Sequence, residues 1–330
     1  MVATEKPVAR LSPALRLRGL LLSQEGVLSI IALISILLLS TQTDRFLTVD
    51  NILNQGRLLT EVGLVALPMT FIIITGGIDL SVGATFGLSA VVLGYSWQNL
   101  GLPLEVAIVI ALLTGGLAGF VNGLFIVRVG VPPLIMTLAT LALYRGLAEG
   151  ISQARSARGY PDWFYTLGQG EFAGVPTQLW VLIVAAIICA LLLSRTVIGR
   201  SLYVIGNNEI AARFSGIPVD TYKLFIYTLS GFMGGLAGYI FVSRVSTTRS
   251  DMGMGLELDV IAAVVLGGTS IFGGTGSIVG TLIGVITIQL LKNGLALTGV
   301  TGDATIIVIG LVLIFAILIN NLIQRWSNTL

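Results

Sequence analysis

The 330-residue chain contains no histidine and only one cysteine. The absence of imidazole excludes histidine-based triads, histidine metal ligands and histidine proton shuttles. The single Cys189 lies in the apolar stretch "VAAIICALLL", where a thiol is typical of a small packing residue, and it cannot form an intramolecular disulfide. No G-x-x-x-x-G-K-[ST] loop and no Cys/His cluster occurs in the sequence, which therefore predicts neither nucleotide hydrolysis nor a metal site in this chain.

Charge is also scarce. Only 10% of residues are charged, whereas 55% are hydrophobic and the mean hydropathy is +0.97. Uncharged stretches long enough to cross a ~30 Å hydrocarbon core recur along the chain. The sequence therefore predicts an all-α, polytopic membrane protein in contact with lipid. A net charge of +2 is too small to indicate nucleic-acid binding.

Charges, prolines and glycine clusters divide the chain into ten candidate spans. They cover residues 26–41, 56–75, 81–99, 105–127, 132–149, 177–194, 223–243, 258–272, 277–297 and 304–324. The eighth and ninth are separated only by "LGGTSIFGGTGS", because residues 260–291 carry no charge yet are too many for one membrane helix. This predicts helices that are broken at glycine-rich segments.

The topology follows from the basic N-terminal tail. Residues 1–25 are expected to stay in the cytoplasm, since lysine and arginine near the first span usually set the orientation. No small-residue cleavage pattern follows the first apolar run, so we expect that run to be retained. An even number of spans in a transmembrane domain over 26–325 then places both termini in the cytoplasm. On this topology residues 150–177 form an outer loop and residues 195–223 a cytoplasmic loop.

The cytoplasmic loop contains "NNEIAARFSGIP", residues 207–218, which predicts a short helix. Asn207 or Asn208 is the N-cap, Glu209 lies in the first turn and Gly216 ends the helix. Two turns are not stable alone in water, so this helix is expected to rest on the lipid headgroups or in a groove of another protein. Its apolar face comprises Ile210, Ala211 and Phe214.

A carboxylate interrupts an apolar run in "GGIDLSVGATFG", residues 76–87. Gly76 and Gly77 allow the helix to break there, and Ser81 can cap the next helix. Because an ionised group facing lipid is unfavourable, Asp79 either anchors this junction near the cytoplasmic face or contacts solute in a pathway.

The same glycine pattern returns near the C-terminus. "GGTGSIVGTLIG", residues 273–284, repeats the earlier glycines with Gly273 and Gly274, and a second register uses Gly267 and Gly268 almost as well. Internal duplication of the kind transporters use is a reasonable interpretation, but the two registers leave its symmetry open. All four glycines are candidates for a helix break or for the translocation pathway.

Aromatic and charged residues mark the outer side. Tyr160 and Trp163 belong to an aromatic group that forms either an interfacial belt or a docking surface for a soluble partner. Arg57 and Glu61, four residues apart, are interpreted as an ion pair near the outer face, and Lys292 as a side chain that extends outward to the interface. Amides and hydroxyls dominate the remaining polar groups, which favours a neutral, hydroxyl-rich solute over an ion.

Four stretches together resemble the permease subunits of bacterial ABC sugar importers, in the ribose, xylose, rhamnose and autoinducer-2 group. They are "TGGIDLSVGA", "GRSLYVIGNNEIAARFSGIPVDTYK", "GLELDVIAAVVLGGTSIFGGTGSIVGTLIG" and "LLKNGLALTGV", and the resemblance covers about residues 45–322. The outer stretch "QARSARGYPDWFYTLGQGEF" does not match the ribose members closely, so the resemblance leaves the sugar open.

The resemblance implies a bacterial inner-membrane permease of about ten helices. Two such permeases, identical or different, would form the pathway at their interface. The resemblance further implies an ATPase with two nucleotide-binding modules that carries the ATP and Mg, so that this chain is no enzyme and binds no cofactor. It also implies a periplasmic sugar-binding protein, expected to dock near Tyr160, Trp163 and Arg249. Matched residue by residue, the helix that would seat in the ATPase comprises Asn208, Glu209, Ala212, Arg213 and Gly216.

Two other classes remain as alternatives. A secondary carrier driven by an ion gradient would use intramembrane carboxylates, of which Asp79 and Asp259 are the candidates. A membrane-embedded enzyme would need a nucleophile with a base or a metal cluster, and no such group is recognisable in the sequence.

Overall fold

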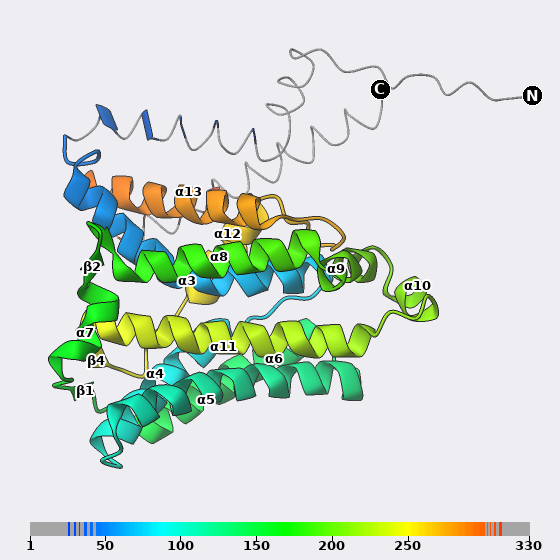
Figure 1. The fold of residues 1–330 in the computed structure, drawn as a ribbon, viewed down its shortest axis with the longest axis horizontal. Helices are drawn as coiled ribbons and strands as arrows, with labels where there is room; N and C mark the ends of the chain where they lie inside the picture. The colour runs from blue at the N-terminus through cyan, green and yellow to red at the C-terminus, as the bar shows by residue number, and fades with distance from the viewer. Residues whose placement is uncertain are drawn as a thin grey trace, which may run out of the picture.

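The computed structural model describes residues 44–300 without a gap and, beyond them, only residues 26, 30, 33, 36, 37, 40, 41, 302, 304, 307, 310 and 311. The predicted tail at 1–25 and the predicted spans at 26–41 and 304–324 therefore lie outside the continuously described part of the chain. Figure 1 shows the resulting bundle, in which helices dominate and strands are confined to short pairs at one end.

Within the described range, each of the other eight predicted spans coincides with a helix. The elements are α3 (Val49–Ile74), α4 (Val82–Gln98), α5 (Leu104–Leu124), the π-helical turn η1 (Phe125–Val129), α6 (Pro133–Ser152), β1 (Ala157–Arg158), α7 (Asp162–Gln169), β2 (Glu171–Phe172), β3 (Val175–Pro176), α8 (Thr177–Arg195), α9 (Val197–Asn207), α10 (Glu209–Phe214), α11 (Val219–Val245), β4 (Thr247–Thr248), α12 (Leu256–Leu266) and α13 (Ile278–Leu297). The prediction for 258–272 was too long, because α12 ends at the glycine pair that follows Leu266.

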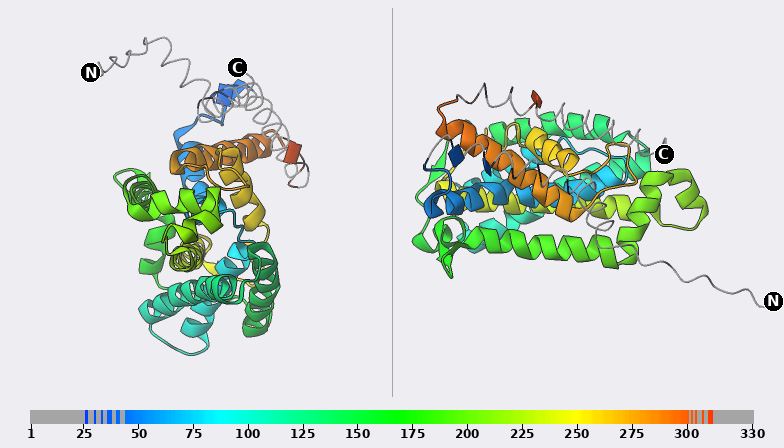
Figure 2. Two further views of the ribbon diagram at one scale, coloured as in Figure 1. Left: turned by 90° about the vertical axis from the view of Figure 1, so that its right-hand side faces the viewer. Right: turned by 90° about the horizontal axis from the view of Figure 1, so that it is seen from above.

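The long helices run side by side along one axis of the bundle (Figures 1 and 2). The α7 helix and the short strands lie at one end, called here the α7 end, whereas α9 and α10 lie at the other, called the α10 end. α11 is central, since it packs against α3, α4, α5 and α7, while α12 and α13 pack against α3 from a different side.

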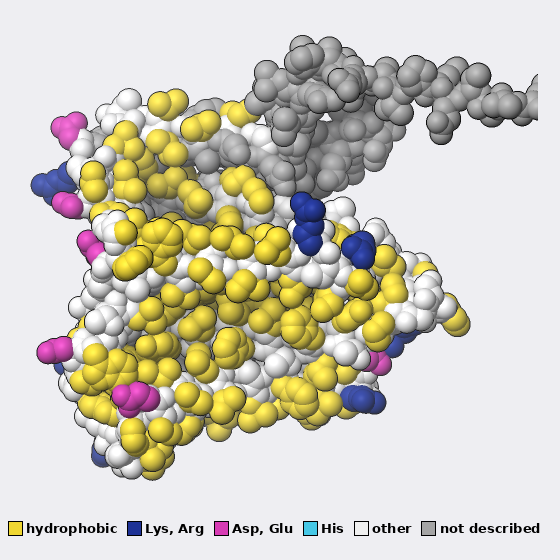
Figure 3. Space-filling view, viewed as in Figure 1, with side chains coloured by type: hydrophobic (Ala, Val, Ile, Leu, Met, Phe, Trp, Pro, Cys, Tyr) yellow, Lys and Arg dark blue, Asp and Glu magenta, His cyan; other side chains and the backbone are white. Residues whose placement is uncertain are grey.

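Six helices of the described range are long and apolar enough to cross a membrane: α3, α5 continued by η1, α6, α8, α11 and α13. Between the two ends the surface in Figure 3 is largely hydrophobic, and the charged side chains gather at the ends. Leucine, isoleucine and valine side chains are exposed along α5, α6 and α8. Such a surface is unfavourable in water and suits hydrocarbon. The chain is a polytopic helical membrane protein.

Glycines bring the backbones of α5 and α11 into direct contact. A Cβ atom added at Gly119 would overlap the Tyr227 carbonyl and approach Gly231, and one added at Gly231 would overlap the Gly115 carbonyl. Close backbone approach through small residues is the usual way in which membrane helices gain packing energy. The contact holds α11 at the centre of the bundle.

Residues 150–177, predicted to form an outer loop, contain regular structure: α7, β1, β2 and β3. Phe164 of α7 is fully buried, and Tyr160 stacks between Trp97 and Phe164 with ring centroids 4.7 and 4.5 Å apart. β1 pairs with β4, which ties the segment to the end of α11, and Ser243 donates to the Phe164 carbonyl at 2.6 Å. Tyr160 and Phe164 are therefore core residues, whereas Trp163 of α7 is exposed. A docking role for the exposed part of this segment stays a prediction.

The local ion pair predicted between Arg57 and Glu61 is wrong. Arg57 instead pairs with Glu171 of β2 at 2.8 Å, and Glu61 receives two hydrogen bonds, at 2.7 and 3.1 Å, from Arg244 of α11. The packing of the helices brings Glu171 to Arg57 and Arg244 to Glu61, so each side chain pairs with a residue distant in sequence and not with its neighbour one helical turn away.

Lys292, interpreted as a side chain that extends outward to the interface, forms an ion pair in the structure, and its position relative to the interface stays a prediction. Its ammonium group donates to the Asp259 carboxylate of α12 at 2.5 Å. The pair joins α13 to α12 near the α7 end, and Asp259 is one of the two carboxylates named as candidates for an ion-coupled carrier.

The α5–α11 contact predicts a contrast between two glycines of one helix. Gly119→Ala should lower the stability of the folded protein by about 1–3 kcal/mol, because its methyl group overlaps α11. Gly116→Ala is the control, since its nearest neighbour is 3.9 Å away, and it should be neutral or slightly stabilising. Thermal unfolding in detergent measures both, and equal melting temperatures for the two variants would contradict the packing described.

Candidate functional site

The predicted short helix is present as α10. Asn208 is in extended conformation between α9 and α10, and its side-chain oxygen accepts a hydrogen bond from the Ala211 N–H at 2.9 Å. Asn208 is thus the N-cap, whereas the Asn207 side chain donates to the Tyr203 carbonyl within α9. Gly216, with φ +79°, follows the last turn in the left-handed conformation that glycine adopts readily. The capping signals confirm the predicted boundaries.

One face of α10 is fixed to the protein. Ala212 is fully buried and packs with Ile205 of α9 and Val219 of α11. Arg213 forms ion pairs with Glu209 at 3.0 Å and with Asp220 at 2.6 Å. These contacts hold the two-turn helix against the beginning of α11.

Electrostatics support the same arrangement. Burial alone would raise the pKa of Glu209, but hydrogen bonds and charge from Lys223 and Arg213 outweigh it and lower the pKa. The hydrogen bond to Asp220, followed by that to Glu209, raises the pKa of Arg213. The pairs are largely exposed, so each contributes little to global stability and serves mainly to orient the helix.

The opposite face of α10 is apolar and uncovered. Phe214 is 90% exposed and Ile210 is 69% exposed, both at the end of the molecule. A phenylalanine this exposed, beyond the helices that cross the membrane, is typical of a surface that another molecule covers.

The first helix break lies between α3 and α4. Gly76 has φ +77°, which few other residues adopt, and the chain then runs irregularly to Val82. Asp79 in this break is 1% exposed and accepts hydrogen bonds from the Ser81 N–H at 2.9 Å and the Ser81 hydroxyl at 2.6 Å. The Ser230 hydroxyl of α11 donates to its second oxygen at 3.1 Å.

These contacts make Asp79 the anchor of the junction in this structure. Asn122 of α5 donates to the Ser81 hydroxyl at 2.8 Å, so that three helices meet at one buried carboxylate. Ser81 occupies the N-cap position of α4 but forms no capping bond, because its hydroxyl is used by Asp79; this part of the prediction is wrong. A contact between Asp79 and a solute in another state stays a prediction.

The second break, residues 267–277, separates α12 from α13. Gly268, Gly273 and Gly274 have φ of +93°, +87° and +77°, so the chain turns through conformations that favour glycine. Gly267 ends α12, where an added Cβ would overlap the Gly280 carbonyl of α13. The prediction of broken helices at the glycine-rich segments is confirmed.

The two breaks touch each other and the end of α9. The Gly274 N–H donates to the Ile74 carbonyl at 2.9 Å, joining the second break to the last residue of α3. A Cβ at Gly206 of α9 would overlap that same carbonyl, and the Tyr203 hydroxyl donates to the Gly276 carbonyl at 2.7 Å. We call this contact of Ile74, Gly206 and Gly274 the glycine junction.

The second break is longer than the first. No single offset therefore aligns both the ends of α3 and α12 and the beginnings of α4 and α13. The two breaks resemble each other in place and direction, although no single alignment relates all of their residues.

The three residues predicted to dock a binding protein differ in exposure. Tyr160 is 4% exposed and stacks between Trp97 and Phe164, whereas Trp163 is 43% exposed on α7. Arg249 is exposed at the same end and forms a bidentate ion pair with Asp251, with hydrogen bonds of 2.9 and 2.5 Å. Sequence reasoning missed Ser230 and Tyr203, because their partners lie on other elements and no local pattern marks them.

No group of three or more metal-ligating side chains occurs within the described range. The described residues thus form a polytopic helical membrane bundle with two helix breaks in contact and a projecting amphipathic helix. Residues 49–317 match the family described as the permease component of the branched-chain amino acid transport system, and the chain belongs to this family of ABC importer permeases.

Similar proteins cover nearly the whole chain. The ribose import permease protein RbsC of Bacillus subtilis is 42% identical over 289 residues, which are 87% of this chain and 89% of that protein. RbsC of Escherichia coli K12 is 37% identical over 91% of this chain and 94% of its own length. The autoinducer 2 import system permease protein LsrD of Photorhabdus luminescens is 35% identical over 92% and 96%. No solved structure matches the chain.

The hydrogen bonds of Asp79 predict different effects for two substitutions. Asp79→Ala should destabilise the protein by about 1–3 kcal/mol, because it leaves buried donors on Ser81 and Ser230 without an acceptor. Asp79→Asn keeps one oxygen acceptor and should cost less. Melting temperatures in detergent test this, with Thr114→Ala as a control that removes a hydroxyl bonded only within its own helix. An Asp79→Ala protein as stable as the wild type would contradict the anchoring role.

Proposed function

We propose that this chain is the permease of an ATP-driven importer that passes a sugar or sugar-like polyol through the inner membrane of a bacterium. The relatives named for ribose and autoinducer 2 support this cargo class, because they match at 35–42% identity over about nine-tenths of both chains. The observation that carries the coupling part of the proposal is α10, a capped helix whose Phe214 is uncovered at one end of the bundle.

The α10 end is assigned to the cytoplasm. Within residues 44–300, five basic residues lie there against two exposed acidic ones, Glu209 and Asp220, an excess that favours the cytoplasmic side. The basic residues are Arg128, Arg195, Arg200, Arg213 and Lys223. With this orientation the α7 end faces the periplasm, and an even number of spans places both termini in the cytoplasm.

A cytoplasmic ATPase with two nucleotide-binding modules is the partner assigned to α10. Phe214 and Ile210 would fill a groove on the ATPase, while Asn208 and Gly216 define the helix ends. Glu209 and Arg213 hold the helix on α11, so a force on α10 acts on the bundle and not on a loose loop. ATP and Mg belong to the ATPase, and this chain binds no cofactor.

The glycine junction gives that force a route. α10 follows α9 directly, and α9 contacts both helix breaks through Gly206 and Tyr203. Because the contacts at Gly206 are backbone to backbone, no flexible side chain absorbs a displacement. Since ATP can shift the transporter only by favouring one state, α10 must contact the ATPase differently in the two states.

The outer side is assigned to capture. A periplasmic binding protein would deliver the sugar at the α7 end and dock on the segments 150–177 and 244–257, where Trp163 and Arg249 are exposed. A second permease, identical or different, would complete the pathway at its interface with this chain.

Loss of the exposed apolar side chain of α10 should prevent assembly with the ATPase without unfolding the permease. Phe214→Ser should abolish stable assembly with the ATPase while leaving the permease folded, because the side chain has almost no contact within the chain. Val197→Ser, an exposed apolar residue of α9, is the matched control and should assemble normally. Co-purification measures both variants; full assembly of Phe214→Ser would contradict the role of α10.

Reversing the charge that orients α10 should give a different defect. Arg213→Glu replaces both ion pairs by repulsion from Glu209 and Asp220, so uptake should fall at least tenfold while ATP hydrolysis continues. Uptake and hydrolysis are measured on the same reconstituted complex. Intact uptake would refute the coupling assignment.

The energy source separates the proposal from an ion-coupled carrier. Proteoliposomes that contain the permease, the ATPase and the binding protein should accumulate sugar only with ATP inside. Permease alone should show no uptake under a proton or sodium gradient, and no micromolar sugar binding by calorimetry, because capture belongs to the binding protein. Gradient-driven uptake by the permease alone would establish the carrier instead.

A further inference from the structure

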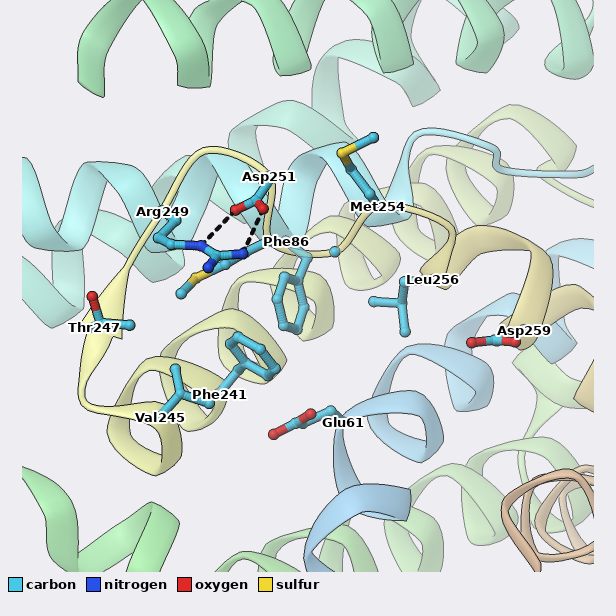
Figure 4. Close-up of a pocket in the computed structure, with 12 residues that line it drawn as sticks. Glu61, Phe86, Phe241, Val245, Thr247, Arg249, Asp251, Met254, Leu256 and Asp259 are labelled. Atoms are coloured by element: carbon cyan, nitrogen blue, oxygen red, sulfur yellow. Dashed lines mark hydrogen bonds and ion pairs between the residues drawn. The ribbon is translucent and has the colours of Figure 1, made fainter. Parts of the chain in front are cut away.

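A cavity of about 420 Å³ opens near the α7 end of the bundle, away from α10 and the glycine junction. Figure 4 shows its lining, with side chains from α3, α4, α11 and α12 and from the segment that joins α11 to α12. Glu61 and Asp259 approach it from α3 and α12, the two helices that end in the glycine-rich breaks. The cavity is therefore lined by α3, which ends at the glycine junction, and by α12, which leads into the break that meets α3 there.

An aromatic pair forms one wall. Phe86 and Phe241 meet edge to face, with ring centroids 5.4 Å apart, and both rings lie at the centre of the view in Figure 4. The guanidinium of Arg244 stands 5.0 Å from the centroid of Phe241 and also binds Glu61. Aromatic faces next to fixed polar groups provide both apolar contact and hydrogen bonds.

Each carboxylate of the cavity already has a cation. Glu61 pairs with Arg244, Asp251 with Arg249 and Asp259 with Lys292. The lining thus presents oriented hydrogen-bonding groups without an uncompensated charge. A charged or zwitterionic ligand would have to break one of these pairs, whereas hydroxyl groups can bond to the paired carboxylates as they stand.

The roof of the cavity is held in place. Arg145 of α6 donates to the carbonyls of Ser250 and Met252, both at 2.7 Å, and so fixes the segment that carries Arg249 and Asp251. The same segment lies directly on α4, where a Cβ added at Gly83 would overlap the Gly253 carbonyl. The cavity is therefore formed before any ligand enters.

We propose that this cavity is a receiving site for a neutral polyhydroxylated solute, a monosaccharide or its derivative, after release from the binding protein. The inference rests on the proposed function and adds to it a place in this chain and a preference for uncharged solutes. The volume is larger than a monosaccharide needs, so the solute shares the cavity with water and is held weakly, as a site of passage requires. An amino acid, as in the description of the family, would be rejected.

Thiol protection tests the site directly, in the complete complex reconstituted with its ATPase and binding protein. Cys189 is buried and provides little background, so single cysteines can be introduced without removing it. Thr247→Cys places a thiol in the lining, and Phe172→Cys places one at the same end but outside the cavity. D-ribose, D-xylose and L-rhamnose are supplied one at a time at high millimolar concentration, with L-leucine and glycine betaine as zwitterionic counterparts.

At least one of the three sugars should slow the reaction of Thr247→Cys with a membrane-impermeant thiol reagent at least threefold. The zwitterions should not slow it, and Phe172→Cys should react at the same rate throughout. Protection by none of the sugars, or equal protection by L-leucine, would overturn the proposal.

A second variant keeps the test independent of labelling. Glu61→Gln should lower sugar uptake severalfold while the binding protein still stimulates ATP hydrolysis, because the variant alters the cavity and not α10. Wild-type uptake by Glu61→Gln together with absent protection would remove the receiving site and leave the proposed function intact. Absence of ATP-dependent sugar uptake in the wild-type complex would instead remove the proposed function.

Discussion

The structure depends on one contact between three stretches of backbone. The Gly274 N–H binds the carbonyl of Ile74, and Gly206 packs against that carbonyl with no room for a side chain. Because these atoms belong to the main chain, the end of α3, the second helix break and the end of α9 cannot move independently over more than a short distance. Glycine at two of the three positions is what permits the contact.

The features assigned to transport are arranged around this constraint. On the proposed cytoplasmic side α10 extends α9 and exposes Phe214, whereas on the other side α3 and α12 carry Glu61 and Asp259 into the cavity. The anchored Asp79 keeps the first break attached to α11 directly, and to α5 through Ser81. On the proposed function, a partner ATPase supplies the energy and acts on this arrangement through α10.

The sequence predicted best what local chemistry controls. The boundaries of α10 follow from Asn208 and Gly216, and the eight described spans follow from hydropathy and the spacing of charges. The glycine pairs correctly indicated where helices break, because glycine, having no Cβ, readily adopts the positive φ that these breaks contain.

Tertiary packing decided the rest. Glu61 binds Arg244, 183 residues further along the chain, instead of Arg57 one turn earlier. The Ser81 hydroxyl donates to Asp79 instead of capping α4. Tyr160 looked like a surface residue because charges surround it in the sequence, yet Trp97 and Phe164 enclose it. For Glu61 and Tyr160 the deciding partners lie on other elements, and neither period nor spacing indicates which elements meet.

The measurement closest to the central claim is the coupling ratio of a Gly206→Ala permease, reconstituted with its ATPase and binding protein. The added methyl group would displace the Ile74 carbonyl, whereas Gly150→Ala, at a glycine with nothing within 4 Å, is the control. If the glycine junction carries motion from α10 to the helix breaks, Gly206→Ala should elute as a folded complex, hydrolyse ATP and lose at least tenfold in sugar moved per ATP. A folded Gly206→Ala complex that transports as efficiently as the Gly150→Ala control would contradict the account.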